Sequence, residues 1–342
     1  MKYFISIFII ISMLMLLGCE KTESPQQTDI SESEYKGMTV IEENRITNVF
    51  SSDKKYFEYD YMFMRESHMH NMFVLSDRIY IAAERVMYDD DGGYHSLLYL
   101  LSYDFDGEDL QSYQILPADE EAEVRFMWYD SQYNLITIEE LNYNFTLYKK
   151  TTDGDVIFSQ PVDVMDIFAM GIGENDNIYI ATKNEVIVYS NDGNLLCEIE
   201  LPNQLTHITF EHGKKPIFEL MGVNNKAIFK YVNTDTKSLT DIEMPVSETV
   251  HFQEADIFYG DGYDYYFSDK NGLFGYDIES NTATEVLDWV NSYINKTQIK
   301  SFVIASPEKT AMICNEKEKA FLFILDRIPD DQIPQTEVIT LG

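Results

Sequence analysis

The feature that most constrains the fold of this 342-residue chain is an internal repeat that covers most of its length. In five places a tyrosine closes an apolar, β-branched run just before a turn, and these tyrosines are spaced by 45, 41, 42 and 45 residues. A period of this length, with several short strands in each repeat, is typical of a β-propeller built from four-stranded blades. The tyrosines that mark the repeat are Tyr103, Tyr148, Tyr189, Tyr231 and Tyr276.

The clearest repeat runs from Met165 to Leu201. It contains four short runs rich in β-branched and aromatic residues, which predict four antiparallel strands. The pair Asp192-Gly193 lies between the third and fourth runs and predicts a hairpin, because glycine adopts positive φ at no steric cost. The second strands of six such units are predicted to begin near Arg78, Asn134, Asn177, Pro216, Tyr265 and Thr310.

We therefore predict an all-β protein, a β-propeller of six four-stranded blades. The sixth repeat lacks a fourth strand, and the segment that begins at Thr39 or at Arg45 is expected to supply it and close the ring. Such closure removes exposed sheet edges. A β-sandwich is the competing architecture, but it does not explain so regular a period. One departure is expected: Leu287, Val290 and Ile294 are spaced for a short amphipathic helix near residues 284–295.

Residues 1–18 have the pattern of an export signal. A basic Lys2 precedes an apolar run that ends at Leu17, shorter than the roughly 20 residues of a spanning helix. The run closes on Leu16-Leu17-Gly18-Cys19, which resembles the lipobox of bacterial lipoproteins. The resemblance implies that Leu16 and Gly18 belong to the lipobox, and that Cys19 is acylated, with palmitate among the acyl groups. Two acyl chains on one residue suffice for stable anchoring.

The order of segments follows from this anchor. Residues 19–37 are polar and are expected to form a disordered spacer. The propeller is predicted over residues 38–329 and a linker with a tail over 330–342. The protein is therefore expected to be extracytoplasmic, lipid-anchored to the outer face of the cell membrane.

Charge excludes some partners. The chain has 25 basic and 59 acidic residues, a net charge of −34. Such a chain is unsuited to nucleic acid, whose phosphates need lysine and arginine, and to electrostatic docking on anionic lipid. The charge suits either a solubilising surface or a surface for cations and basic partners. Besides Cys19, Cys197 and Cys314 form neither a disulfide framework nor a metal motif, and we expect them to behave as small buried hydrophobes.

Metal and catalytic motifs are weak or missing from the sequence. His68 and His70 share one face of a predicted strand but lack a further ligand. The acidic loops Asp89–Asp91 and Asp104–Asp109 could hold calcium, yet neither has the twelve-residue pattern, and Asp-Gly pairs also suit blade turns. The sequence contains no arranged nucleophile and base. We predict no metal, no cofactor and no enzymatic activity.

One segment suggests a binding surface. Residues 258–267 concentrate aromatic and acidic side chains, which suit a carbohydrate or peptide ligand. The alternative is that these rings only fill the space between blades. The predicted surface consists of Tyr259, Tyr263 and Tyr265, with Trp128 and Tyr129 behind them.

The segment Gly272–Asn295 resembles the propeller region of some clostridial-type lipoproteins, between their lipid anchor and their solute-binding domain. The ending Pro334–Gly342 is similar to the linker and first strand of that domain. The resemblance implies an accessory module of an ABC-type importer, mostly for sugars. The family's solute-binding domain is absent, so a truncated or variant form is expected, and Val338–Leu341 should lack partner strands.

The sequence thus predicts a non-enzymatic, lipid-anchored propeller that binds a ligand or partner in nutrient uptake, with ABC importer components among its expected partners. Two alternatives stay open. The first is a propeller hydrolase or lyase that acts on extracellular glycans, with catalytic groups on loops at one end of the ring. The second is a structural spacer that lifts a binding domain from the membrane.

Overall fold

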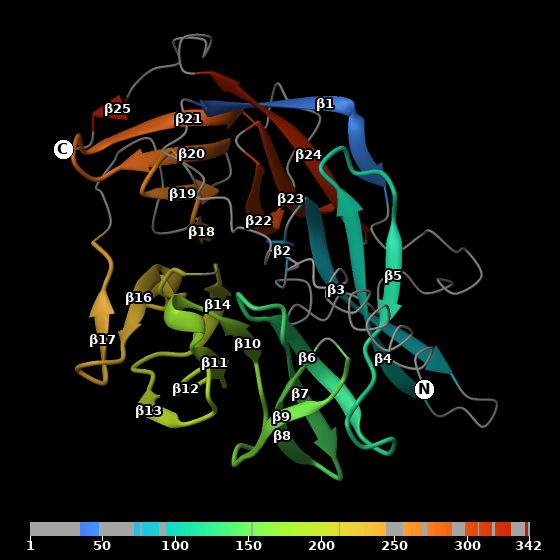
Figure 1. Cartoon of the computed structure of the whole chain (residues 1–342). Helices are drawn as coiled ribbons and strands as arrows, with labels where there is room; N and C mark the ends of the chain where they lie inside the picture. The colour runs from blue at the N-terminus through green and yellow to red at the C-terminus, as the bar shows by residue number, and fades with distance from the viewer. Residues whose placement is uncertain are drawn as a thin grey trace, which may run out of the picture.

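The computed structural model of the chain is an all-β propeller (Figure 1). It describes residues 35–47, 72–75, 77–88, 94–151, 153–211, 213–243, 256–260, 262–268, 272–288, 298–306, 308–316, 319–329 and 339–340. Helical structure in these residues is confined to two short 3₁₀ turns, Glu174–Asp176 and Val223–Asn225. The prediction of an all-β propeller is confirmed. The predicted signal, Cys19 and most of the predicted spacer lie outside the described residues.

The strands form five four-stranded sheets and one five-stranded sheet, each antiparallel. The first three sheets follow the chain in order. Their strands are β2 (Met72–Leu75), β3 (Arg78–Tyr88), β4 (Tyr94–Asp104) and β5 (Gln111–Gln114); β6 (Glu123–Tyr129), β7 (Leu135–Leu141), β8 (Asn144–Lys150) and β9 (Val156–Val162); and β10 (Ala169–Ile172), β11 (Ile178–Ala181), β12 (Glu185–Tyr189) and β13 (Leu195–Glu200).

The remaining sheets continue the same order, and the two chain ends join them. Their strands are β14 (Leu205–Thr209), β15 (Ile217–Met221), β16 (Ala227–Asn233) and β17 (Ser238–Asp241); β18 (Asp256–Phe258), β19 (Tyr265–Ser268), β20 (Gly272–Asp277), β21 (Thr282–Asp288) and β25 (Ile339–Thr340); and β22 (Gln298–Ser306), β23 (Lys309–Glu316), β24 (Lys319–Pro329) and β1 (Tyr35–Thr47).

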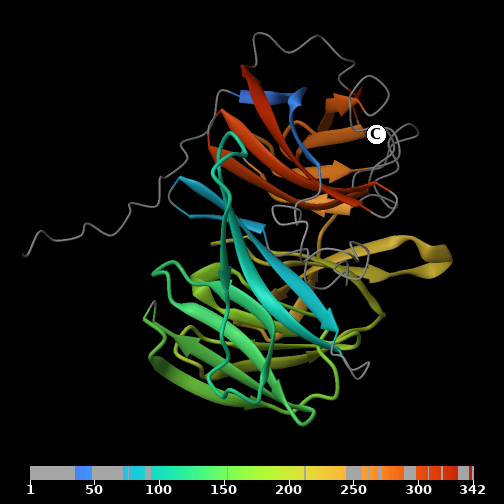
Figure 2. The ribbon, with the colours of Figure 1, turned by 90° about the vertical axis from the view of Figure 1, so that its right-hand side faces the viewer.

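The sheets follow one another around a ring, with the first strand of each nearest the middle (Figure 1). The ring closes where β2 contacts β22, and β1 of the last sheet also contacts β21. Seen from the side, the sheets of β6–β9 and β10–β13 lie at one end of the molecule and that of β22–β24 at the other (Figure 2). Inner strands are covered on both faces, so every residue of β10 and β11 is buried, whereas most of β9 and β13 is half-exposed or exposed.

The N-terminal strand completes the last sheet, as predicted. β1 pairs with β24 through Thr39↔Asp326 and Val40↔Leu325, and again through Arg45↔Phe323 after a break in register. Both segments proposed for this role therefore belong to one strand. β1 begins at Tyr35, earlier than the predicted boundary of the propeller at residue 38.

The predicted helix near residues 284–295 is wrong over its first part. Residues 282–288 form strand β21, which pairs with β20 through contacts such as Tyr276↔Ala283 and Leu273↔Leu287. Threonine and valine favour this pairing, and a neighbouring strand offers hydrogen bonds that the apolar spacing alone does not reveal. The rest of the predicted helix, from Trp289 on, lies outside the described residues.

The C-terminal tail is not an orphan strand. β25 pairs with the outer strand of the fifth sheet through Ala283↔Ile339 and Thr282↔Thr340. The sheet therefore has one strand more than predicted. The reason is that an outer strand presents unpaired backbone groups, and a tail within reach satisfies some of them.

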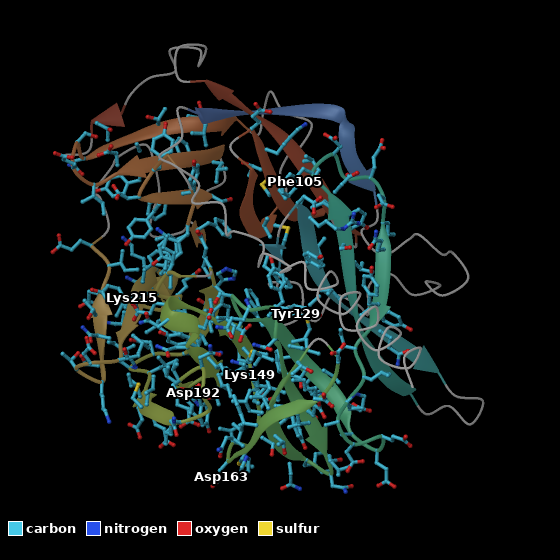
Figure 3. The ribbon with its side chains drawn as sticks, viewed as in Figure 1. Phe105, Tyr129, Lys149, Asp163, Asp192 and Lys215 are labelled. Atoms are coloured by element: carbon cyan, nitrogen blue, oxygen red, sulfur yellow. The ribbon has the colours of Figure 1, made fainter. Side chains whose placement is uncertain are left out.

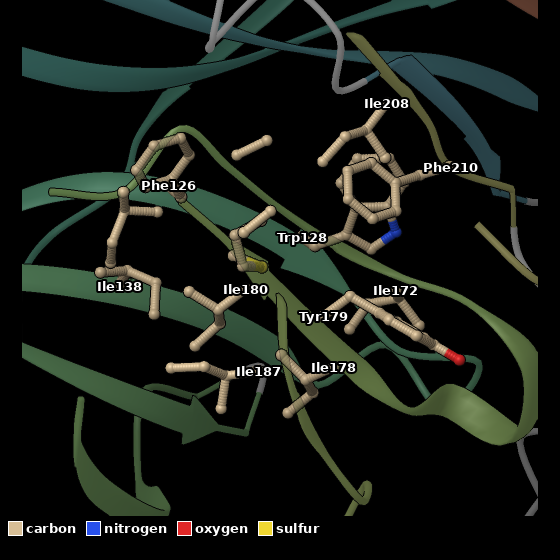
Figure 4. Packing of buried hydrophobic residues seen from close by; sticks show 14 of the residues in the cluster. Phe126, Trp128, Ile138, Ile172, Ile178, Tyr179, Ile180, Ile187, Ile208 and Phe210 are labelled. Atoms are coloured by element: carbon tan, nitrogen blue, oxygen red, sulfur yellow. The ribbon is translucent and has the colours of Figure 1, made fainter. Parts of the chain in front are cut away.

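Aromatic side chains bridge the sheets in the interior. Trp128 of β6 contacts Phe73 of β2, with 5.5 Å between ring centroids, and Phe210 after β14 at 5.7 Å. Phe210 lies against Gly171 of β10, where an added Cβ would be only 2.4 Å from its ring. One aromatic group thus connects four sheets, and Figure 4 shows Trp128 and Phe210 together with isoleucines of the same core.

Candidate ligand-binding surface

Three tyrosines gather where the fourth and fifth sheets meet. Tyr259 follows β18, Tyr265 begins β19 and Tyr231 lies in β16, and each is half-buried. The rings of Tyr259 and Tyr265 have centroids 5.8 Å apart, and Phe267 lies 6.4 Å beyond Tyr265. Strand pairing holds the backbone of Tyr231 and Tyr265 in place. We call Tyr231, Tyr259 and Tyr265 the tyrosine surface.

A lysine completes the arrangement. The hydroxyl of Tyr259 donates a hydrogen bond to the backbone carbonyl of Lys215 at 2.8 Å. The Lys215 ammonium lies over the ring of Tyr231, 4.8 Å from its centroid. Within the described residues, the hydroxyls of Tyr231 and Tyr265 form no hydrogen bond, so both remain available to a ligand.

Burial and nearby charges keep the phenols of Tyr259 and Tyr265 protonated. Burial raises the pKa of Tyr259 well above its usual value, with smaller contributions from neighbours that include Tyr265 and Glu211. Burial is also the main cause of the raised pKa of Tyr265, to which Asp264 and Tyr231 add. A phenol with a raised pKa stays neutral at physiological pH and acts as a hydrogen-bond donor and acceptor.

Tyr263, the third tyrosine predicted for this surface, packs inward instead. Its ring covers Gly275 of β20 so closely that an added Cβ would lie 2.2 Å from it. It also meets Tyr266 edge to face, with 5.5 Å between centroids. The structure therefore brings Tyr259 and Tyr265 together and gives Tyr263 a packing role.

Trp128 and Tyr129 do not lie behind the tyrosine surface. Trp128 is 1% exposed within the core. Tyr129 is half-buried against Phe73, with centroids 5.8 Å apart. Figure 3 shows Tyr129, which ends β6, apart from Lys215, which lies between β14 and β15. The prediction placed Trp128 wrongly because aromatic residues look alike in sequence, whether they cover a surface or fill a ring.

A second surface was missed from the sequence. The connector between the first and second sheets places three exposed carboxylates beside Tyr148, and together with Ala118 they line a pocket. The available signal was an unbroken acidic run in a connecting loop. The acidic residues of the pocket are Asp119, Glu120 and Glu121.

A buried ion pair supports that connector. Lys150 binds the Glu139 carboxylate, and their side chains are only 4% and 2% exposed. Glu139 also accepts hydrogen bonds from the backbone N–H of Ala118 at 2.6 Å and from the Thr137 hydroxyl at 2.9 Å. Lys150 further donates to the carbonyl of Leu116 at 3.2 Å. The carboxylate and the ammonium therefore both have further hydrogen-bond partners, which offset the cost of burying the two charges.

The neighbouring residue forms a second buried pair. Lys149 contacts Asp130 at 2.8 Å, and their side chains are 7% and 0% exposed. The same ammonium donates to Asn191 in the third sheet, at 2.5 Å to its side-chain oxygen. Ser131 adds a bond to Asp176 at 2.5 Å. These contacts fasten the second sheet to the third.

No group of three or more metal-ligating side chains occurs among the described residues. In the loop Asp104–Asp109, Asp104 accepts hydrogen bonds from the backbone of Asp106 and Glu108, and Asp109 binds Arg78 at 2.9 Å. This loop acts as a turn. Asp89–Asp91, His68 and His70 lie outside the described residues.

The described part of the chain contains no helix long and apolar enough to cross a membrane. No family model and no curated protein matches the sequence. Solved structures similar to the chain include virginiamycin B lyase from Staphylococcus aureus (14% identity, TM-score 0.45, covering 80% of this chain and 87% of that one). Another is the β-propeller domain of the Trilobed protease from Pyrococcus furiosus (10% identity, TM-score 0.46, covering 80% of this chain and 84% of that one). A third is a gluconolactonase from Xanthomonas campestris (11% identity, TM-score 0.41, covering 72% of this chain and 90% of that one). Likenesses this distant assign no activity to the chain.

Proposed function

We propose that this chain is a non-enzymatic binding propeller, held at the outer face of the cell membrane by lipid on Cys19. The tyrosine surface is the observation that carries the binding function. Sheet pairing fixes the strands that carry Tyr231 and Tyr265, and the hydroxyls of these two residues have no hydrogen bond among the described residues. Preorganised aromatic faces with a few polar groups are typical of ligand sites.

The titratable groups favour binding over catalysis. Several tyrosines, among them Tyr103, Tyr179 and Tyr259, and Cys197 have a displaced pKa, and burial raises the pKa of each of these groups. A general acid or base works best with a pKa near the operating pH, and a cysteine nucleophile needs a lowered one. The buried carboxylates of Asp130 and Glu139 are held in ion pairs.

The binding function is tested with the full-length lipoprotein in phosphatidylcholine vesicles, probed against glycan and peptide arrays. We expect Tyr265→Ala to lose most of the binding, because a stacking face and a hydroxyl disappear together. Tyr143→Ala is the matched control, since Tyr143 is 91% exposed in a distant hairpin and should leave binding unchanged. Turnover of a bound glycan would favour the hydrolase or lyase, and a folded protein that binds nothing would favour the spacer.

The anchor rests on the sequence Leu16-Leu17-Gly18-Cys19. Cys19→Ala is expected to abolish fatty-acid labelling and to release the protein from membranes, because one thioether supplies both acyl chains. Intact-mass analysis of the mature protein gives the modification directly. An uncleaved chain with an unmodified cysteine would disprove the anchor.

The resemblance to importer lipoproteins supports an association with an ABC-type, sugar-directed solute-binding protein. Cross-linking in native membranes, followed by identification of an importer component, tests the association.

We infer also that the six sheets are the blades of one ring, since neighbouring sheets contact one another and the last sheet returns to the first. An experimental structure with another number of blades would contradict the count.

A further inference from the structure

We propose that Lys215 and the tyrosine surface together bind a saccharide that carries a carboxylate. This inference rests on the proposed binding function and names the ligand class for the same surface. Lys215 is the group that sets the class, because it adds a positive charge over the ring of Tyr231, which packs against the same core cluster as Tyr259 and Tyr265.

Lys215 differs from the lysines of this acid-rich chain that are held in ion pairs. The chain has 59 acidic and 25 basic residues, so a lysine readily finds a carboxylate partner. Four lysines of the described residues do contact a carboxylate. Among the described residues, the Lys215 ammonium forms no ion pair and meets only the face of Tyr231. A cation held over an aromatic ring can still contact an anion on its other side. The paired lysines are Lys149, Lys150, Lys230 and Lys309.

The position of Lys215 is fixed by the surface itself. The Tyr259 hydroxyl binds the Lys215 backbone carbonyl, so the side chain begins at a defined point beside the rings. Tyr259 and Tyr265 lie 5.8 Å apart and present half-buried faces. Such faces suit the C–H side of a sugar ring, and the open hydroxyls suit its polar edge.

Nearby acids limit the ligand to one local negative charge. The Asp264 carboxylate is engaged by the backbone N–H of Ile278 at 2.6 Å, whereas Glu211 adds to the negative field around Tyr259. A net charge of −34 repels anions at long range, although salt screens exposed charges beyond roughly 8–10 Å. One cation in this setting can hold a single carboxylate but not a polyanion.

The test uses the full-length lipoprotein in phosphatidylcholine vesicles and an array of uronic- and sialic-acid glycans, each beside its methyl ester. We expect at least one acid to bind about tenfold or more tightly than its ester, as for a hydrogen bond to a charged group. Lys215→Ala should remove this preference and Lys215→Arg should retain it. Lys214→Ala is the matched control, because Lys214 is the exposed neighbour and should leave the preference intact.

The outcomes separate the two proposals. If acids and esters bind equally, the charge assignment is overturned and the binding function stands. A preference that survives Lys215→Ala would assign the charge to another residue and overturn this inference. Binding of peptides alone would overturn it as well. If neither glycans nor peptides bind the folded protein, the proposed function fails together with the inference.

Discussion

Lys150→Met should lower the free energy of unfolding by about 3–5 kcal/mol, because it leaves the Glu139 carboxylate charged and buried without its partner. Glu139 is 2% exposed, so water cannot replace the lost ammonium without opening the structure. The same change removes the bond to the Leu116 carbonyl that helps to fix the acidic connector. Urea denaturation followed by circular dichroism measures the effect.

Two further variants show whether burial is the cause. Lys230→Met breaks a pair whose carboxylate, Asp241, is 72% exposed, and should cost less than about 1 kcal/mol. Adding Glu139→Gln to Lys150→Met should recover part of the loss, since the charge is gone and an amide oxygen can still accept from Ala118. A cost for Lys150→Met no greater than that for Lys230→Met would contradict a buried pair.

The second large effect is expected at the aromatic centre of the ring. Trp128→Ala should destabilise the protein by about 3–5 kcal/mol, the range for truncation of a large buried aromatic side chain. Trp128 contacts rings from the first and fourth sheets, so its loss leaves a cavity that no single sheet can fill by moving. Denaturant titration of the purified protein gives the value.

The comparison with an exposed ring makes this result specific. Tyr143→Ala removes a ring that is 91% exposed and should change stability by no more than about 0.5 kcal/mol. A Trp128→Ala protein with unchanged stability but lost ligand binding would return Trp128 to the surface role predicted from the sequence. A Trp128→Ala protein that is less stable but still binds its ligand would place Trp128 in the core.

Both effects bear on binding, because the tyrosine surface depends on neighbouring sheets that keep their relative positions. The Thr209 hydroxyl donates to the Ile257 carbonyl at 2.6 Å and joins β14 to β18 near that surface. Lys149 and Asn191 join the second and third sheets in a comparable way. A ligand that meets side chains from two sheets pays less ordering entropy when such bonds already fix them.

Much of the fold was readable from local pattern. The second strands predicted near Arg78, Asn177 and Tyr265 all exist, and the tyrosine that closes each repeat lies at or near the end of a third strand. The hairpin at Asp192-Gly193 also forms, with Gly193 at a φ of 81°. These features depend on residues close together in the chain, whose alternation and turn chemistry are visible in the sequence.

The candidate site was only half readable. The aromatic density around residue 260 pointed to Tyr259 and Tyr265, but nothing local separated them from Tyr263, which turns inward over Gly275. Tyr231 was visible only as a repeat marker, and Lys215 was missed because a single lysine carries no pattern. Which of these side chains meet depends on how the fourth and fifth sheets pack.

The sequence by itself determined the repeat, the strands within it and the need for an N-terminal strand to complete the last sheet. Tertiary structure alone decided that residues 282–288 pair as a strand, that β25 joins the fifth sheet and that Trp128 is buried. The physical reason is distance along the chain. Strand propensity and turns act between neighbours, whereas contacts such as Lys149 with Asn191 join residues 42 positions apart, and only the packing of neighbouring sheets brings them together.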